Sequence, residues 1–233
     1  MGTAQIALRS GGARQREFLA SLGLLGMLHS ELPERARPLF PAPANWGTIE
    51  TATIGFGHGI SVAPLSYIAA AAVVVNGGRR ITPTFLKHPA DARGDQILKP
   101  ETSDKMRDLL RYVVTDGTGR KADIRATRSA ARPARPRSRV RTAAAYQSHV
   151  LVTSFFAAFP ISDPRYIVFV LLDTPHGTKE TGGTALAGLT AAPLAGRVIS
   201  RIAPILGVPQ KPVTLAARET HNGTTIGGHD RDG

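Results

Sequence analysis

Two apolar runs dominate the hydrophobic pattern of the chain between Val150 and Pro175. They read V-L-V-T-S-F-F-A-A-F and R-Y-I-V-F-V-L-L-D, and both are rich in residues that favour strands. Prolines, a serine and an aspartate between them are typical of a turn. We predict a β-hairpin with strands Val150–Phe159 and Arg165–Asp173. Because neither run alternates with polar residues, we expect helices on both faces of its sheet.

Apolar spacing elsewhere predicts helices over Ala13–Leu28, Leu65–Val75, Lys99–Val113 and Gly182–Leu206, the last one bent near Pro193. Ser61 is a candidate N-cap for the second helix, and Asn76-Gly77-Gly78 is expected to end it. Between the helices, Leu32–Asn45 is predicted to be extended and Arg80–Leu86 to be a short edge strand.

Composition narrows the class of protein only slightly. A chain of 233 residues with 42% hydrophobic residues has room for one large or two small globular domains. It contains no cysteine, and its seven histidines show no metal-ligand spacing, so no metal or cofactor is expected. No apolar run reaches the ~18 residues of a membrane span, and the first residues lack a signal-peptide pattern.

The net charge of +12 is concentrated in one segment. Seven arginines and no acidic residue lie within Arg125–Arg141, and removing them leaves a net charge of +5. A charge confined to one stretch does not describe a basic binding face of the whole fold, so nucleic acid is not favoured as a partner.

Glycines at 55, 57 and 59 precede the helix Leu65–Val75 and raise two enzymatic possibilities. The dinucleotide spacing G-x-G-x-x-G is absent, and Gly59-Ile60-Ser61-Val62-Ala63 does not complete a nucleophile elbow. The glycines are therefore interpreted as a tight loop packed on a helix.

Several segments in order resemble one family, the penicillin-binding transpeptidases, and best the class B, septal (cell-division) type. They are G-F-G-H-G-I-S-V-A-P-L, N-G-G, V-V-T-D-G-T-G-R-K-A, T-S-F-F-A-A-F-P, D-P-R-Y-I-V-F-V-L-L-D and T-P-H-G-T-K-E-T-G-G. The resemblance covers about Gly2 to Gln210, except for the arginine-rich segment. It implies an α+β fold of the penicillin-binding transpeptidase and serine β-lactamase type, here incomplete, with an antiparallel sheet flanked by helices.

Chemistry in this family rests on the motifs S-x-x-K, S-x-N and K-T-G. No serine of this chain has lysine three positions later, no asparagine has serine two positions before it, and K-T-G does not occur. In relatives, S-x-N falls immediately before the segment resembling Gly2–Leu8, and S-x-x-K falls further upstream. We therefore assign no catalytic residue and expect an inactive fragment without the family's anchor.

The K-T-G strand should lie between Ala122 and Tyr146, where the chain reads I-R-A-T-R-S-A-A-R-P-A-R-P-R-S-R-V-R-T-A-A-A. One allowed coding of Arg125–Val140, shifted by two bases, reads G-Y-P-V-G-G-K-T-G-T-A-E-K-P. A lost base after Ile124, compensated before Tyr146, is the hypothesis we favour over a native basic linker. Prolines and like charges then predict a disordered loop over 125–145 and an unpaired edge on the strand at Val150.

These expectations divide the chain into 1–206, the C-terminal portion of a transpeptidase domain, and 207–233, a flexible tail. The missing upstream part should leave apolar surface open on the sheet and on helix Leu65–Val75. The family implies peptidoglycan stem peptides, penicillins and divisome membrane proteins as partners, and a membrane-anchored periplasmic domain. Without signal or anchor, this chain would be cytoplasmic if expressed as it stands.

A second hypothesis stays open: a non-catalytic protein whose segment Arg125–Arg141 binds an anionic partner, nucleic acid or acidic lipid, through non-specific charge.

Overall fold

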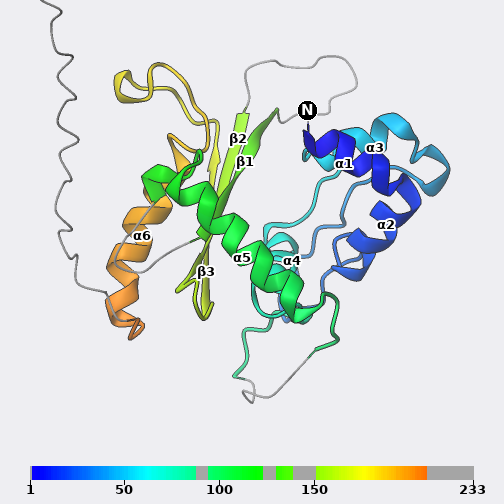
Figure 1. Ribbon diagram of the computed structural model, residues 1–233, viewed down its shortest axis with the longest axis horizontal. Helices are drawn as coiled ribbons and strands as arrows, with labels where there is room; N and C mark the ends of the chain where they lie inside the picture. Colours follow the sequence, from blue (N-terminus) through cyan, green and yellow to red (C-terminus); the bar gives the residue numbers. More distant parts are fainter. Residues whose placement is uncertain (1, 88–93, 123–129, 139–150, 209–233) are drawn as a thin grey trace, which may run out of the picture.

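A computed structural model describes residues 2–87, 94–122, 130–138 and 151–208, the third of these ranges by its backbone (Figure 1). Within these residues the α-helices are α1 (Gly2–Ser10), α2 (Gly12–Ser21), α3 (Thr48–Gly55), α4 (Pro64–Val75), α5 (Pro100–Thr115) and α6 (Ala191–Ile205). The strands are β1 (Ala130–Ser138), β2 (Leu151–Phe159) and β3 (Tyr166–Asp173). Short 3-10 helices are η1 (Pro43–Asn45), η2 (Arg120–Ala122) and η3 (Lys179–Thr181).

The predicted hairpin is confirmed to within a residue at each end. β2 and β3 pair antiparallel from Phe159 opposite Tyr166 to Val152 opposite Asp173. The three described strands form one sheet in the order β1-β2-β3, so β2 is its central strand.

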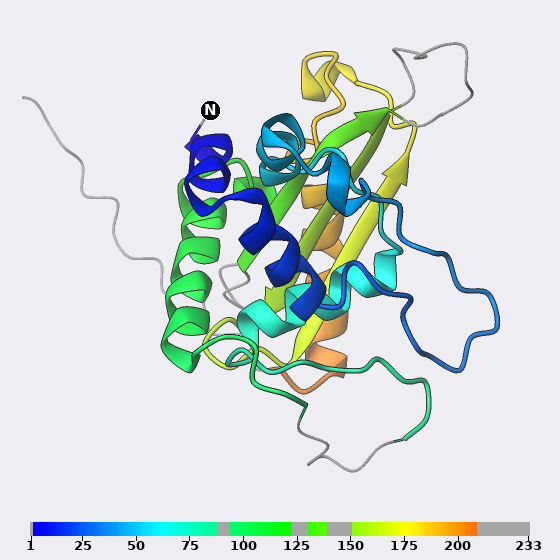
Figure 2. The same cartoon turned by 90° about the vertical axis from the view of Figure 1, so that its right-hand side faces the viewer.

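Helices cover both faces of this sheet, as the unbroken apolar runs predict. Phe155, Ala157 and Phe159 of β2 are buried in one core with α6, while Phe156 and Ala158 are buried in a second core with α4 and α5. Figure 2 shows α6 behind the strands and α1 to α4 in front of them. Successive residues of β2 therefore contribute to opposite cores.

The expectation of a loop over 125–145 is wrong for residues 130–138, which form β1 and pair antiparallel with β2. The register shifts by one residue between Ala134 and Arg137, a β-bulge on β1. The bulge puts Pro133 and Pro136 in the same phase of the strand, so both imide nitrogens can face away from β2. A strand at the sheet edge tolerates this loss of donors, whereas a central strand does not. The rest of 125–145 lies outside the described residues.

Helices α4 and α5 confirm two predicted segments, and a buried hydroxyl joins them. The Ser103 hydroxyl, with no exposed surface, donates to the Val74 carbonyl at 2.7 Å and accepts from the Gly77 N–H at 3.0 Å. α4 ends at Val75 with Asn76 as its C-cap, and Gly77 and Gly78 follow with φ of 87° and 86°. The N-cap of α4 is Ala63 rather than Ser61, whose backbone instead bridges to Leu39.

Other boundaries differ from the predicted ones. α2 ends at Ser21 instead of continuing to Leu28, because Gly23 takes a φ of 78°, which no helix contains. Arg80–Leu86 is not a strand; its neighbour Arg79 makes one isolated bridge to Gln96. α6 begins at Ala191, so Pro193 lies in the first turn, where its missing N–H costs nothing, and it does not bend the helix.

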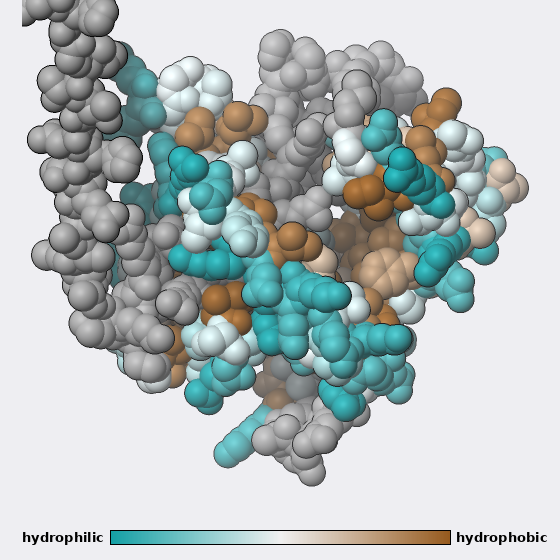
Figure 3. Space-filling view, viewed as in Figure 1, coloured by the Kyte–Doolittle hydropathy of each residue, from teal (hydrophilic) through white to brown (hydrophobic). Residues whose placement is uncertain are grey.

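The expectation of exposed apolar surface on the sheet and on α4 is confirmed only at Leu171 of β3, among the residues whose burial is described. No residue of α4 after Pro64 is exposed, so that helix is not left uncovered. Ile6, Ile49, Phe85 and Leu86 are at least 65% exposed, on α1, α3 and the loop after α4. On the face drawn in Figure 3, hydrophobic residues are interspersed with hydrophilic ones.

Candidate functional site

The candidate site region is the β1 side of the sheet, where the resemblance puts the K-T-G strand. β1 is an edge strand against β2, and α5 lies against it. In the shifted reading frame, lysine, threonine and glycine of that motif fall at positions 131, 132 and 133. These backbone positions lie opposite Ala157, Phe156 and Phe155 of β2. A strand therefore lies in the region where the resemblance expects the K-T-G strand, and its residues 131–133 read A-R-P.

Buried polar side chains serve the fold in the part of the chain that is described. Thr51, Ser66, Ser103 and Thr153 are buried, and no buried side-chain nitrogen or oxygen there lacks a hydrogen-bond partner. The Thr51 hydroxyl donates to the Gly47 carbonyl at 2.8 Å. That of Thr153 lies 3.3 Å from the Thr190 hydroxyl, which joins β2 to the start of α6. The partners of Thr51, Ser103 and Thr153 are backbone or hydroxyl groups and not bases that could activate a nucleophile.

The glycine-rich segment behaves as the sequence analysis interprets it. Gly55 ends α3 where a Cβ would lie 2.6 Å from the Ala7 Cβ of α1, so only glycine permits this approach of the two helices. Gly57 and Gly59 follow with φ of 94° and 84°. The His58 ring stands edge-on to Phe56 at 5.3 Å. Gly55 thus lets α3 pack closely against α1, and the two helices lie side by side in Figure 1.

Two shallow hollows are present on the described surface. One, of about 360 Å³, lies between the end of α2, α4 and the loop after α4, with His29, Ser66 and Arg80 as polar lining residues. The other, of about 290 Å³, is lined along α6 by Leu194, Arg197, Val198 and Arg201. Neither described lining contains a lysine or carboxylate that could activate a nucleophile. Among the described residues, no group of three metal-ligating side chains gathers.

The fold is that of penicillin-binding transpeptidase domains. It superimposes on the transpeptidase domain of penicillin-binding protein 3 from Burkholderia pseudomallei with a TM-score of 0.80 and 23% identity, covering 90% of this chain and 62% of that one. A structure described as a peptidoglycan glycosyltransferase from Burkholderia ambifaria gives a TM-score of 0.76 at 23% identity, covering 90% and 61%.

Sequence comparison gives the family itself. Residues 1–198 match the penicillin binding protein transpeptidase domain, and the chain belongs to that family. It is 37% identical over 227 residues to a probable peptidoglycan D,D-transpeptidase FtsI from Caulobacter vibrioides, covering 93% of this chain and 38% of the relative. It is 32% identical to stage V sporulation protein D from Bacillus subtilis, covering 76% and 28%. The chain thus spans well under half the length of these relatives.

Family membership confirms the resemblance. The structure adds that residues 130–138 form the strand β1, although their composition does not favour a strand.

Proposed function

We propose that this chain is the C-terminal part of the transpeptidase domain of a septal-type peptidoglycan transpeptidase, and that it is catalytically inactive as it stands. The observation that carries the proposal is the match to the transpeptidase family over residues 1–198, with 37% identity to the FtsI relative. The family's reaction is acyl transfer from the D-Ala-D-Ala end of a stem peptide to a serine, which penicillins also acylate.

Inactivity follows from the absence of the groups that perform this acyl transfer. A serine hydroxyl becomes an effective nucleophile when a nearby base takes its proton, as the lysine of S-x-x-K does. This sequence contains no S-x-x-K, no S-x-N and no K-T-G. Without a serine to acylate and a motif to hold the substrate carboxylate, neither stem peptide nor penicillin can form an acyl-enzyme.

A changed reading frame accounts for the third of these absences. The shifted coding of Arg125–Val140 supplies G-Y-P-V-G-G-K-T-G-T-A-E-K-P, with K-T-G at positions that lie within β1. A lost base followed by a compensating change preserves the chain on both sides, where T-G-R-K-A and T-S-F-F-A-A-F-P retain the family pattern. The frame change predicts a disordered loop here, so the pairing of 130–138 with β2 does not support it and leaves the native basic linker open as the alternative.

Partners and location extend the same proposal. Peptidoglycan stem peptides and penicillins are the ligands of the family, and divisome membrane proteins are proposed partners of the complete protein. In the described part of the chain, no helix is both long enough and apolar enough to cross a membrane.

Labelling with a fluorescent penicillin tests the inactivity. The purified chain is incubated with the label, denatured, and separated on a gel beside the transpeptidase domain of the Caulobacter relative as the positive control. We expect a labelled band for the relative and none for this chain, because no S-x-x-K serine is present. A stoichiometric, denaturation-resistant adduct on this chain would disprove the proposal.

A further inference from the structure

The hollow of about 360 Å³ between the end of α2, α4 and the loop after α4 has apolar walls. Leu22 connects its lining to the buried core that contains Ala70 and Val73 of α4, and Leu25 and Met27 add further apolar side chains. At roughly 30 Å³ for each water-sized group, the hollow has room for about twelve non-hydrogen atoms. It is therefore large enough for a small organic molecule.

Hydrogen bonds hold together the two loops that border this hollow. The Glu31 carboxylate, in the segment after α2, accepts from the Thr84 hydroxyl and, at 3.0 Å, from the Phe85 N–H. The Arg80 N–H donates to the Asp95 carbonyl at 2.8 Å. These bonds fix the loop after α4 against the segment after α2, so the opening between them belongs to the fold.

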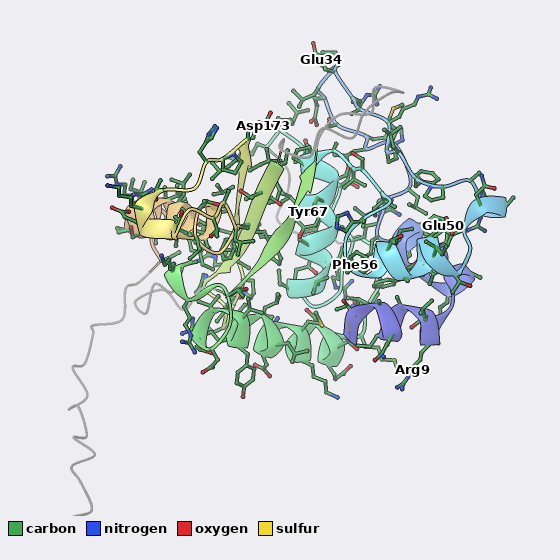
Figure 4. All side chains as sticks on the ribbon, turned by 90° about the horizontal axis from the view of Figure 1, so that it is seen from above. Arg9, Glu34, Glu50, Phe56, Tyr67 and Asp173 are labelled. Atoms are coloured by element: carbon green, nitrogen blue, oxygen red, sulfur yellow. The ribbon has the colours of Figure 1, made fainter. Side chains whose placement is uncertain are left out.

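Ser66 of α4 brings a hydroxyl without a partner to the hollow. The residue is 6% exposed, and its hydroxyl makes no hydrogen bond within the described part of the chain. Every fully buried side-chain oxygen there has a partner, so the Ser66 oxygen keeps accessible surface, and Ser66 lines the hollow. The next residue, Tyr67, packs instead on Phe156 and Phe169 of the sheet, and Figure 4 labels it beside the strands. Ser66 thus belongs to the side of α4 that faces away from the sheet.

Arg80 gives the hollow a positive charge. Its guanidinium lies across the end of α2, with Nη2 3.3 Å from the position that a Cβ would take at Gly23. Gly23 has no side chain to fill this place, and its φ of 78° favours glycine. Among the described residues no carboxylate pairs with Arg80, and the described lining contains no acidic residue, its other polar members being His29 and Thr82. The charge and the Ser66 hydroxyl are therefore both available to a ligand.

We propose that this hollow binds a small molecule with one carboxylate group and an apolar body, such as a medium-chain carboxylic acid. The Arg80 guanidinium and the Ser66 hydroxyl are the donors to the carboxylate, and Leu25 and Met27 cover the apolar body. Ser66 is the third residue of α4, whose N-cap Ala63 makes no side-chain hydrogen bond, so the positive end of the helix dipole also favours an anion there.

The charge of the site favours a carboxylate over a phosphate. One guanidinium balances a single negative charge, whereas a phosphate monoester carries about −1.5 to −2 at neutral pH. The proposal goes beyond the acyl-transfer function and does not depend on it, because reversible binding of an anion requires none of the three absent motifs. The alternative is a structural role, in which the Arg80 charge only stabilises the C-terminal end of α2.

Octanoate is the probe, and methionine methyl groups report where it binds. The full 233-residue chain has three methionines, of which Met27 lines the hollow and Met106 lies on α5. In NMR spectra of the chain labelled with carbon-13 at these methyl groups, we expect octanoate to shift the Met27 signal saturably and to leave that of Met106 in place. The variant Met27→Leu assigns the signal. 1-Octanol, with the same chain length and no charge, should bind at least about tenfold more weakly, because it cannot pair with Arg80.

Substitutions test the two donors by isothermal titration calorimetry with octanoate. We expect Arg80→Gln to weaken binding by at least about tenfold and Ser66→Ala by about threefold. Arg79→Gln is the matched control, because Arg79 is exposed, adjacent in the chain and outside the described lining, and its replacement should leave the affinity unchanged. Circular dichroism checks that the variants fold; should Arg80→Gln unfold, Ser66→Ala and the comparison with 1-octanol decide.

Several results would overturn the proposal. They are the absence of a saturable Met27 shift, equal shifts of Met27 and Met106, equal affinity for octanoate and 1-octanol, and equal weakening by Arg80→Gln and Arg79→Gln. Lower stability of Arg80→Gln with unchanged octanoate affinity would establish the structural role instead. Octyl phosphate that binds about tenfold more tightly than octanoate would identify a phosphate site and would equally contradict the proposal.

Discussion

Gly77 and Gly78, in the connection between α4 and α5, differ in how much space there is for a Cβ atom. Both residues have positive φ, a region in which a side chain costs about 1–2 kcal/mol. They differ in their surroundings: a Cβ at Gly77 meets nothing within 4 Å, whereas one at Gly78 would lie 2.1 Å from the Leu98 carbonyl oxygen. The N-G-G sequence is thus a helix end followed by a close backbone approach.

Substituting each glycine separates the two effects. We expect Gly77→Ala to lower the free energy of unfolding by about 1 kcal/mol and Gly78→Ala to lower it by at least about 2 kcal/mol more. Urea denaturation followed by circular dichroism measures both. Equal losses would show that the Leu98 carbonyl moves away without cost and that the close approach is unimportant.

Ser103 holds the same connection through hydrogen bonds. Its buried hydroxyl serves both the Val74 carbonyl and the Gly77 N–H. Ser103→Ala should lower the free energy of unfolding by about 2 kcal/mol, because it leaves a carbonyl and an N–H without their partner. Ser200, whose exposed hydroxyl bonds only to the Arg197 carbonyl of its own helix, is the control, and Ser200→Ala should cost less than about 0.5 kcal/mol. Comparable losses would argue against the bridge.

At the residue scale, the sequence predicts such roles only where a residue type has few alternatives. Asn76-Gly77-Gly78 is recognisable as a helix end because glycine favours positive φ. The contact of Gly78 with Leu98 and the bridge made by Ser103 depend on residues 20 or more positions away, and the local pattern contains nothing about them.

Among the elements, the most predictable ones are those whose pattern is local and continuous. The hairpin, α4 and α5 all carry long apolar or amphipathic runs, and all form as predicted. α3 was missed because T-I-E-T-A-T-I is rich in β-branched residues, which disfavour helix; the Gly47 N–H bonded to Glu50 at 3.1 Å marks its start. β1 was missed for the converse reason: its composition opposes a strand, and pairing with β2 overrides it.

Repair of β1 tests that account at the element scale. Replacing Arg125–Ser138 with G-Y-P-V-G-G-K-T-G-T-A-E-K-P introduces valine, tyrosine and threonines and removes the prolines from the centre of the strand. We expect the free energy of unfolding to rise by at least about 1 kcal/mol. The control carries the same fourteen residues in shuffled order. An equal rise in the control would mean that only removal of the arginine charge matters.

At the scale of the whole molecule, the described part of the chain has the family's fold, whereas the sequence contains none of the family's three catalytic motifs. Two cores enclose a central strand, and the site strand β1 has its place beside it, yet the motifs that act there are absent from the sequence. Core packing depends on volume and polarity, which many sequences supply, whereas acyl transfer depends on a few identities. For that reason the fold could be predicted from the resemblance of segments spread along the chain to the family, while the proposed inactivity rests on a search for specific residues.

The nucleotide sequence from the codon of Ile124 to that of Tyr146 tests the central claim most directly, because it distinguishes a transpeptidase strand altered by a frame change from a native basic segment. Sequencing the genomic DNA independently of the existing reading provides it. We predict that the codons of Arg125–Val140, read in the shifted frame, encode G-Y-P-V-G-G-K-T-G-T-A-E-K-P or a close variant containing K-T-G. Codons that yield no K-T-G in either alternative frame would contradict the account.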